Sequence, residues 1–408
     1  MRESYAVCSE GAEVEERMYR VLLVQAEMKR YRVPLFTSVH AELLRDHIEL
    51  TVAYSNSNRS HALRGDSADL PLPMGRKVAG HWFFHRFIYQ PLWRQIIRAD
   101  LVIVGPEIKY LINPILLLMS GVGLKKVAFF GLGPNRFPDR SPLAEWIKKH
   151  FFTRVDWWFA YTASIAEHLE SEGMPADRIT NVQNATDSTA LRSLLKTIED
   201  EEVVGEKMRL TGSRDSRIGF YCGTLGEIKA IPLLVSAARL VKLRCPEFHL
   251  VVIGNGPQRP WLERAVVEDP WIHYLGSKYD RESALYYKMA DIFLLAGTVG
   301  LAIADSFAAG LPVVATDLPT HPPEISYIAE GYNGRLVPHE ERPFADAIIA
   351  ILSDSVLMQK LREGAQASAS LYTMEAMVDN FRRGIEKCLH YYGFGEDARG
   401  LATSRTNG

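Results

Sequence analysis

A lysine in the second half of the chain stands where it could meet an anion. Lys229 follows the strand-like run Arg217–Cys222 and a short glycine-containing turn, and it lies just before a helix with Pro232 in its first turn. A cation at the start of a helix gains nothing from the helix dipole, so an anionic ligand is one interpretation of Lys229. A solvated lysine is the other, and spacing alone favours it.

An aspartate nearby lies in an apolar setting. Asp305 is inside residues 301–309, which read LAIADSFAA. Buried carboxylates are rare unless a partner satisfies them, so we expect Asp305 to face a cleft and accept hydrogen bonds, for example from sugar hydroxyls. A local hydrogen bond to the backbone is the alternative. At the start of this helix, backbone N–H groups would form an anion site. These belong to Gly300, Leu301 and Ala302.

The familiar nucleotide loops are missing. Residues 26–34, the first loop, contain no glycine, and Gly254-Asn255-Gly256 lacks a third glycine because Arg259 takes its place. No GxxxxGK[ST] loop occurs either. A nicotinamide or ATP-binding function is therefore disfavoured.

Composition excludes several further classes. The chain has 408 residues, with 47 Lys+Arg against 49 Asp+Glu, which argues against a generally basic protein that coats nucleic acid, so we expect no nucleic-acid partner. Its four scattered cysteines form no C-x-x-C or Cys/His cluster. This predicts neither a zinc site nor a disulfide framework, and it favours a reducing, cytoplasmic location.

The elements that would position these residues follow one pattern. Strand-like apolar runs alternate with helical patterns in both halves, which predicts parallel strands covered on both faces. The fold class expected is α/β, with two doubly wound Rossmann-like domains facing a central cleft. The expected boundaries are a flexible tail at residues 1–19, an N-terminal acceptor-side domain at 20–187, a linker with a surface helix at 188–216, a C-terminal donor domain at 217–370, a helix returning to the N-terminal domain at 371–393 and a disordered tail at 394–408.

Three segments bear on membranes. Residues 111–124 are apolar but too short to span a bilayer, and we expect a buried helix there. Residues 81–98 and 148–154 interleave aromatic and basic residues, which suits a membrane interface. A core helix with a solvated basic edge is the other interpretation of either segment, and both stay open.

An ordered series of sequence pieces gives a resemblance. The pieces are GTLGEIKAIPLL, VVIGNGP, HYLGSKYDRESALYYKMADIFLL, GTVGLAIADSFAAGLPVVATD, PPEI and GYNGRLVP. Together they resemble the donor domain of glycosyltransferase family 4, which has the GT-B fold, over most of residues 217–340. ITNVQNATD, at residues 179–187, resembles the family's strand before the interdomain linker. YRVP and FFGLGPNR in the first half fit one subgroup more loosely.

The resemblance implies an activity and a set of site residues. It implies retaining transfer of a sugar from a nucleotide-sugar donor to a glycan or lipid-linked acceptor, with no metal or other cofactor, in envelope or exopolysaccharide biosynthesis. Lys229 and Asp305 would be the catalytic-site residues, on the leaving diphosphate and the ribose. The donor site would comprise Gly223, Thr224, Lys229, Asn255, Gly256, Ser277, Gly300, Leu301, Ala302 and Asp305, and the acceptor side Arg32, Gly133, Asn135 and Arg136.

Three positions depart from the family pattern. Gly297 stands at the first of two acidic positions, Thr224 at a phosphate-binding arginine, and Leu132 near a histidine that many relatives have. A degenerate, non-catalytic binding partner is therefore the main alternative. A sugar-nucleotide epimerase is less favoured, because few carboxylates are expected in the cleft.

Overall fold

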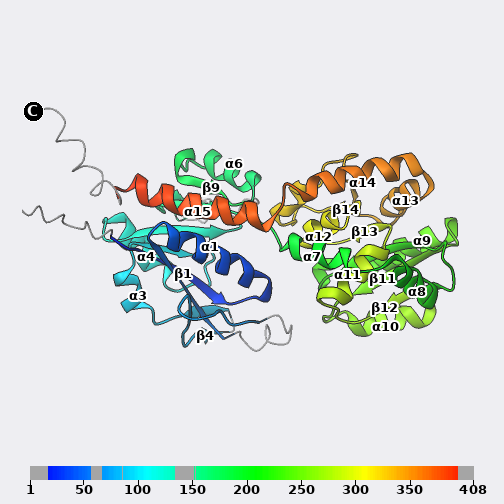
Figure 1. Ribbon diagram of the computed structural model, residues 1–408, viewed down its shortest axis with the longest axis horizontal. Helices are drawn as coiled ribbons and strands as arrows, with labels where there is room; N and C mark the ends of the chain where they lie inside the picture. Colours follow the sequence, from blue (N-terminus) through cyan, green and yellow to red (C-terminus); the bar gives the residue numbers. More distant parts are fainter. Residues whose placement is uncertain (1–16, 57–66, 85, 134–150, 152, 394–408) are drawn as a thin grey trace, which may run out of the picture.

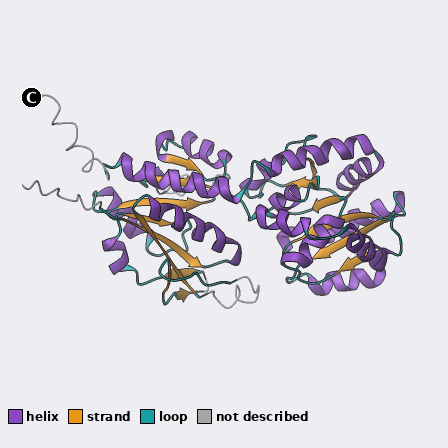
Figure 2. Cartoon of the chain, in the orientation of Figure 1, coloured by secondary structure: helices purple, strands orange, loops and turns teal. Residues whose placement is uncertain are grey.

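The computed structural model describes residues 17–56, 67–84, 86–133, 151 and 153–393 (Figure 1). The chain forms two α/β domains with helices around each sheet (Figure 2). Most of the two predicted tails falls outside the described residues, as do most of residues 148–154 and the candidate acceptor residues Asn135 and Arg136.

The N-terminal domain is built on seven parallel strands in the order β3-β2-β1-β6-β7-β8-β9. Their bounds are β1 Tyr19–Glu27, β2 Ile48–Ser55, β3 Gly75–Lys77, β6 Leu101–Val104, β7 Lys126–Gly131, β8 Trp157–Ala160 and β9 Ile179–Asn181. Side chains alternate between the two faces of a strand. In β1, Val21 and Leu23 enter one apolar cluster while Leu22 and Val24 enter another. The continuous apolar run therefore reflects a sheet buried on both faces.

Helices from both ends of the chain cover this sheet. On one face lie α1 (Val33–Arg45) and α15 (Met374–Tyr391), which pack beside each other (Figure 1). The other face carries α3 (Trp93–Arg98), α4 (Asn113–Gly121) and α6 (Ala163–Ser171). Short 3₁₀ turns, η1 (Arg30–Arg32) and η2 (Ala176–Arg178), precede α1 and β9.

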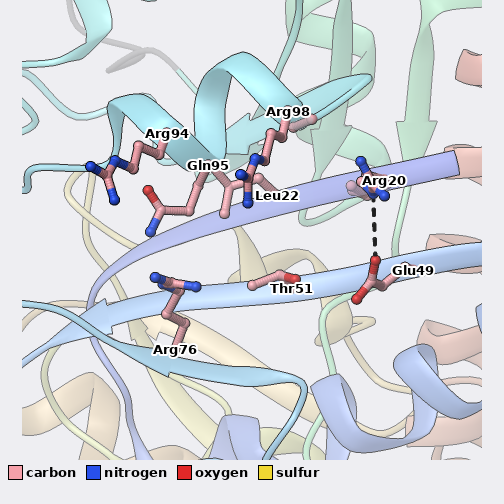
Figure 3. A pocket seen from close by; sticks show the side chains of 10 residues that line it. Arg20, Leu22, Glu49, Thr51, Arg76, Arg94, Gln95 and Arg98 are labelled. Carbon is pink, nitrogen blue, oxygen red and sulfur yellow. Dashed lines mark ion pairs between the residues drawn. The ribbon is translucent and has the colours of Figure 1, made fainter.

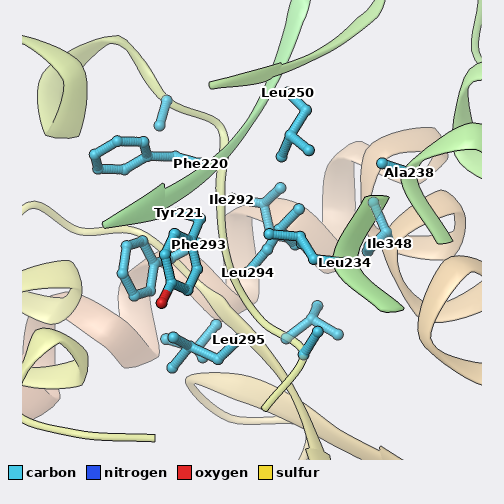
Figure 4. Packing of buried hydrophobic residues seen from close by; sticks show 14 of the residues in the cluster. Phe220, Tyr221, Leu234, Ala238, Leu250, Ile292, Phe293, Leu294, Leu295 and Ile348 are labelled. Atoms are coloured by element: carbon cyan, nitrogen blue, oxygen red, sulfur yellow. The ribbon is translucent and has the colours of Figure 1, made fainter. Parts of the chain in front are cut away.

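The C-terminal domain repeats the architecture with six parallel strands in the order β12-β11-β10-β13-β14-β15. The strands are β10 Arg217–Cys222, β11 Phe248–Ile253, β12 Ile272–Tyr274, β13 Ile292–Leu295, β14 Val313–Asp317 and β15 Gly334–Pro338. The helices are η3 Glu227–Lys229, α9 Ile231–Arg244, α10 Arg259–Glu268, α11 Asp280–Met289, α12 Ala302–Ala308, η4 Pro323–Tyr327, α13 Glu341–Ser353 and α14 Ser355–Ala369. Phe220, Leu234 and Ile292 lie in its core (Figure 4). The α/β, doubly wound prediction is confirmed.

The segment predicted as a linker differs from expectation. Residues 188–216 form two helices, α7 (Ser188–Lys196) and α8 (Asp200–Thr211), which pack on α11 of the C-terminal domain. The Tyr286 hydroxyl donates to Glu206 at 2.7 Å, and Arg281 pairs with Glu202 at 2.7 Å. The acidic residues that suggested a solvated linker thus pair with residues of the neighbouring helix α11. The chain crosses between the two sheets in the short stretch 182–187.

The structure excludes one of the two open interpretations of residues 81–98 and corrects the burial expected for residues 111–124. Residues 81–98 form the hairpin β4 (His81–Phe83) and β5 (Phe87–Tyr89) followed by short α3, so they are not a core helix. The helix expected within residues 111–124 is present as α4, but it is only half-buried, because Leu116 is buried while Leu118 is 68% exposed. One side of α4 packs on the sheet and the other faces outward. Within the described part of the chain, no helix is both long and apolar enough to cross a membrane.

The docking of α15 depends on a close approach at Gly384. A Cβ atom there would lie 2.7 Å from Phe159 and from Thr180 of the N-terminal sheet. We predict that Gly384→Ala lowers the free energy of unfolding by about 1–3 kcal/mol through overpacking. Gly205→Ala, in α8 with no atom within 4 Å, is the matched control and should raise it by about 0.4–1 kcal/mol. Denaturant unfolding of both variants checks this, and equal effects would contradict it.

Candidate active site

Two loops at the carboxyl ends of β10 and β11 pack against each other through glycines. A Cβ atom at Gly254 would lie 1.7 Å from the Gly223 carbonyl oxygen, and one at Gly256 would lie 2.6 Å from the Leu225 carbonyl oxygen. Leu225 N donates to the Asn255 carbonyl at 3.0 Å, which ties the loops together. The Asn255 side chain accepts from Gly256 N at 2.9 Å. The predicted donor residues Gly223, Asn255 and Gly256 therefore have a structural role in shaping this edge of the sheet.

Lys229 ends η3 and points across this edge. Its ammonium donates to the carbonyls of Thr298 at 2.6 Å and Val299 at 3.1 Å, in the loop after β13. Nζ lies 3.8 Å from where a Cβ atom would be at Gly300. Burial lowers the pKa of Lys229 to about 8, and the nearby Glu324 carboxylate opposes that shift. The lysine is not the freely solvated side chain that spacing alone favoured.

The close packing of the η3 turn on the loop after β13 explains why Gly297 stands at the family's first acidic position. A Cβ atom at Gly297 would lie 2.3 Å from the Lys229 carbonyl carbon and 2.4 Å from the Ile228 carbonyl oxygen. Thr298 N donates to that Ile228 oxygen at 2.8 Å, so the η3 turn and the loop are joined by backbone. No side chain fits at position 297 in this arrangement. The missing carboxylate is therefore coupled to the position of Lys229.

A histidine that sequence analysis did not single out supports this loop. Val299 N donates to Nδ1 of His321 at 3.1 Å, so the ring's proton is on Nε2, which lies 2.6 Å from the Thr316 carbonyl. Burial lowers the pKa of His321, which favours the neutral ring that this arrangement needs. The TDLPTHPPEI stretch contained the residue, but no motif pointed to it.

The start of α12 faces the same region. The first hydrogen bonds of the helix run from Ile303 N to the Gly300 carbonyl and from Ala304 N to the Leu301 carbonyl. The N–H groups of Gly300, Leu301 and Ala302 precede these bonds, so they have no partner within the helix. Gly300, the first of the three, lies beside the Lys229 ammonium.

Asp305 lies one turn further along α12 and meets the other domain's chain. Its Oδ1 accepts from the Thr186 hydroxyl at 2.7 Å, in the crossover between the sheets. Burial raises the pKa of Asp305 to about 6; the Thr186 hydrogen bond opposes the shift and nearby Asp187 adds to it. The partner in this structure is a side chain of the crossover, so the alternative of a bond to the local backbone does not hold. Thr186 was missed, although it lies in the ITNVQNATD piece.

The crossover is also held from η4. Asn184 Nδ2 donates to Glu324 at 2.6 Å, and the Tyr327 hydroxyl donates to the Asn184 carbonyl at 2.7 Å. Glu324 is buried and lies in the PPEI piece, so that motif was the available signal for it. On the other side, Arg30 of η1 pairs with Asp280 at 2.9 Å. These contacts join the two domains across the candidate site.

Of the predicted acceptor-side residues, the structure describes Arg32 and Gly133. Arg32 is only 5% exposed, and its guanidinium lies 5.0–5.6 Å from the ring centroids of Tyr31, Tyr161 and Phe130. No described carboxylate lies within ion-pair distance of it. Gly133 adopts a φ of +73°, and the preceding Leu132 is 46% exposed.

The remaining donor residues are at the surface. Thr224 is exposed and contributes its carbonyl to the Tyr221 hydroxyl at 2.7 Å. Ser277 is exposed beside Gly276, whose carbonyl accepts from Gly254 N at 2.9 Å. Among the described side chains, no group of three or more His, Cys, Asp or Glu is placed to hold a metal ion.

Comparisons with known proteins agree with this geometry. Residues 216–354 match the family model described as glycosyl transferases group 1. The chain is 26% identical to alpha-monoglucosyldiacylglycerol synthase of Acholeplasma laidlawii over 181 residues, which are 43% of this chain and 44% of that one. It is 30% identical to phosphatidyl-myo-inositol mannosyltransferase of Mycolicibacterium smegmatis over 163 residues, 38% of this chain and 40% of that one. The matches thus span less than half of either relative.

The fold extends the likeness to both domains. The structure of HepE from Anabaena in complex with UDP superposes with a TM-score of 0.65 at 15% identity, covering 90% of this chain and all of that one. The family model covers most of the C-terminal domain, including Lys229 and Asp305, so this domain is similar to the glycosyl transferases group 1, and the chain as a whole has the GT-B fold.

Proposed function

We propose that the chain transfers a glycosyl unit from a nucleotide-sugar donor to a glycan or lipid-linked acceptor, with retention of configuration and without a metal. The single observation that carries the proposal is the Lys229 ammonium, which lies beside Gly300 and the N–H groups that open α12. A cation and backbone donors that converge at the carboxyl ends of parallel strands suit a nucleoside diphosphate.

The donor would bind with its diphosphate over residues 300–302. Lys229 would neutralise charge as it develops on the leaving phosphate, which is electrostatic stabilisation without covalent chemistry. Asp305 would hold the ribose and release Thr186 in doing so, and the turn at Ser277 would frame the base. Thr224 would supply a neutral hydrogen bond where relatives have arginine, which is weaker than a charge-assisted one.

On the acceptor side, the departing phosphate would take the acceptor's proton as the new glycosidic bond forms on the same face of the sugar. No side-chain base is then required, which makes Leu132 tolerable at the position near the family's histidine. Arg32 and the turn at Gly133, continuing to Asn135 and Arg136, would face the acceptor. Arg32 would suit an anionic acceptor, because its buried charge forms no ion pair with a described carboxylate, although the charge of nearby Glu324 contributes to raising its pKa.

Location and partners belong to the same proposal. We place the protein in the cytoplasm, at the inner face of the membrane, in envelope or exopolysaccharide biosynthesis. Relatives named for glycolipid products support a lipid-linked acceptor. The exposed apolar residues of the N-terminal domain support contact with a membrane surface.

A non-catalytic, nucleotide-binding partner is the second candidate. The observation that favours it is the closed space at Gly297, together with Thr224 at the family's arginine position. It predicts nucleotide binding without transfer or hydrolysis. The half-buried groups Asp305 and Lys229 favour activity instead, because desolvation of a charged group costs stability unless a function retains it.

We predict that Lys229→Ala lowers kcat by about 10²–10³-fold, since a positioned charge at the leaving group is lost. Asp305→Asn should weaken nucleotide binding by about 10–100-fold, the usual effect of removing a charged hydrogen-bond partner. Nucleotide-sugar turnover and calorimetric binding measure these effects. Lys360→Ala, at an exposed position of α14, is the control and should leave both unchanged. Near-normal rates in both site variants would contradict the proposal.

The pH dependence of kcat/KM should be bell-shaped. Asp305 becomes protonated as pH falls through about 6, and Lys229 loses its charge as pH rises through about 8, so activity should decline on both sides of that window. Lys229→Arg should extend the alkaline side, because a guanidinium keeps its proton there. A profile flat from pH 5 to 9 would be incompatible with these assignments.

Position 297 offers a test of the coupling between the glycine and the lysine. Gly297→Ala should lower the free energy of unfolding by about 1–3 kcal/mol and weaken nucleotide binding, because the new methyl group displaces the η3 turn that carries Lys229. Gly226→Ala, in the loop after β10 that leads into η3, is the matched control, with φ −97° and no atom within 4 Å of its Cβ. If the two variants behave alike, the steric account is wrong.

A further inference from the structure

A pocket lined by arginines lies in the N-terminal domain, away from the candidate active site. Its volume is about 620 Å³ (Figure 3). Arg20 comes from β1, Arg76 from β3, and Arg94 and Arg98 from α3, so three separate elements supply four guanidinium groups. Only Glu49 among the lining residues is acidic.

The architecture explains why the pocket exists. Arg20 and Glu49 lie at the amino-terminal ends of β1 and β2, the opposite end of the sheet from the carboxyl-end loops. Leu22, which lines the pocket, belongs to the sheet face packed by α3, where Leu92 and Ile96 are buried. Thr51 and Arg76 extend that lining onto β2 and β3. α3 therefore covers only part of this sheet face, and its arginines lie beside the part left open, which is the pocket.

The positive charge of this pocket is only partly balanced. Arg20 lies 3.8 Å from Glu49, a loose ion pair. Arg76 faces the neutral side-chain amide of Gln95, whose oxygen accepts from Arg76 Nε at 2.7 Å when the amide is turned over. Arg94 and Arg98 are exposed, and no described carboxylate lies within ion-pair distance of either. Four cations and one anion leave an excess of positive charge that suits an anionic ligand, and arginine is the residue best suited to phosphate oxygens.

Apolar residues beside the pocket indicate where the phosphate comes from. Ile97, between Arg94 and Arg98 in the sequence, is 70% exposed. The Lys125 ammonium donates to the Ile97 carbonyl at 3.1 Å, which joins the end of α3 to the turn that follows α4. The exposed side of that neighbouring segment is apolar as well: Leu118, Val122 and Leu124 are 68%, 61% and 71% exposed. Soluble surfaces rarely leave such residues adjacent, whereas cations beside exposed apolar side chains suit a bilayer interface.

We propose that this arginine pocket, formed by Arg20, Arg76, Arg94 and Arg98, binds the phosphate of an anionic phospholipid headgroup while Ile97 and the exposed side of α4 enter the bilayer interface. The proposal deepens the membrane contact proposed above and does not depend on sugar transfer. It assigns a lipid site at the amino-terminal end of the N-terminal domain's sheet, separate from the donor loops of the C-terminal domain.

Co-sedimentation of the full chain with vesicles tests the proposal. Wild-type protein should bind phosphatidylglycerol vesicles and bind phosphatidylcholine vesicles much more weakly, with the difference shrinking as salt rises. The double variant Arg94→Gln/Arg98→Gln should bind phosphatidylglycerol vesicles about 25-fold more weakly, since each basic side chain near an anionic surface contributes about fivefold. Arg244→Gln/Arg264→Gln, on exposed positions of the C-terminal domain, should bind like wild type.

Several outcomes would overturn the proposal. Equal vesicle binding by the two double variants would show that the pocket takes no part in membrane binding. Equal binding of both lipids by the wild type would show that headgroup charge does not determine binding. Displacement from vesicles by inorganic phosphate at constant ionic strength would identify a free-phosphate site instead of a lipid site. Nucleotide binding measured on the same variants separates this result from the proposed sugar transfer: it should stay unchanged even where vesicle binding is lost.

Discussion

The arrangement of the candidate site depends on one half-buried cation and the two carbonyls that hold it. The Lys229 ammonium joins the loop after β10 to the loop after β13, through Thr298 and Val299. That contact brings η3 so close to Gly297 that only glycine fits there, and His321 fixes the same loop from the other side. A desolvated ammonium with only neutral acceptors on it is well placed to gain from an arriving diphosphate.

The two domains meet at the same place. Two hydrogen bonds tie the crossover between the sheets to the C-terminal domain. Thr186 donates to Asp305 of α12, and Asn184 donates to Glu324 of η4. Asp305 therefore has a protein partner in the present arrangement that a ribose hydroxyl would replace in the proposed complex. Donor binding and the position of the N-terminal domain would then be linked through one carboxylate.

Sequence alone predicted the architecture well because continuous apolar runs are a direct consequence of sheets buried on both faces. The strand-like run expected at Arg217–Cys222 agrees with β10 to the residue. It failed where the partner of a segment is distant in sequence. The charges of α8 pair with α11, the apolar outer side of α4 packs on nothing described, and His321 acts through the backbone of Val299. The site was foreseeable where a residue type was unusual for its surroundings, as with Asp305, and hidden where loops meet in space.

The most direct test of this account is the titration of the Lys229 ammonium by NMR, with and without a nucleoside diphosphate, using Lys229→Arg to assign the signal. The account predicts a pKa of about 8 in the free protein, lowered by burial, that rises when the diphosphate binds because an adjacent anion favours the charged form. An ordinary lysine pKa that the nucleotide leaves unchanged would contradict the central role given to this residue.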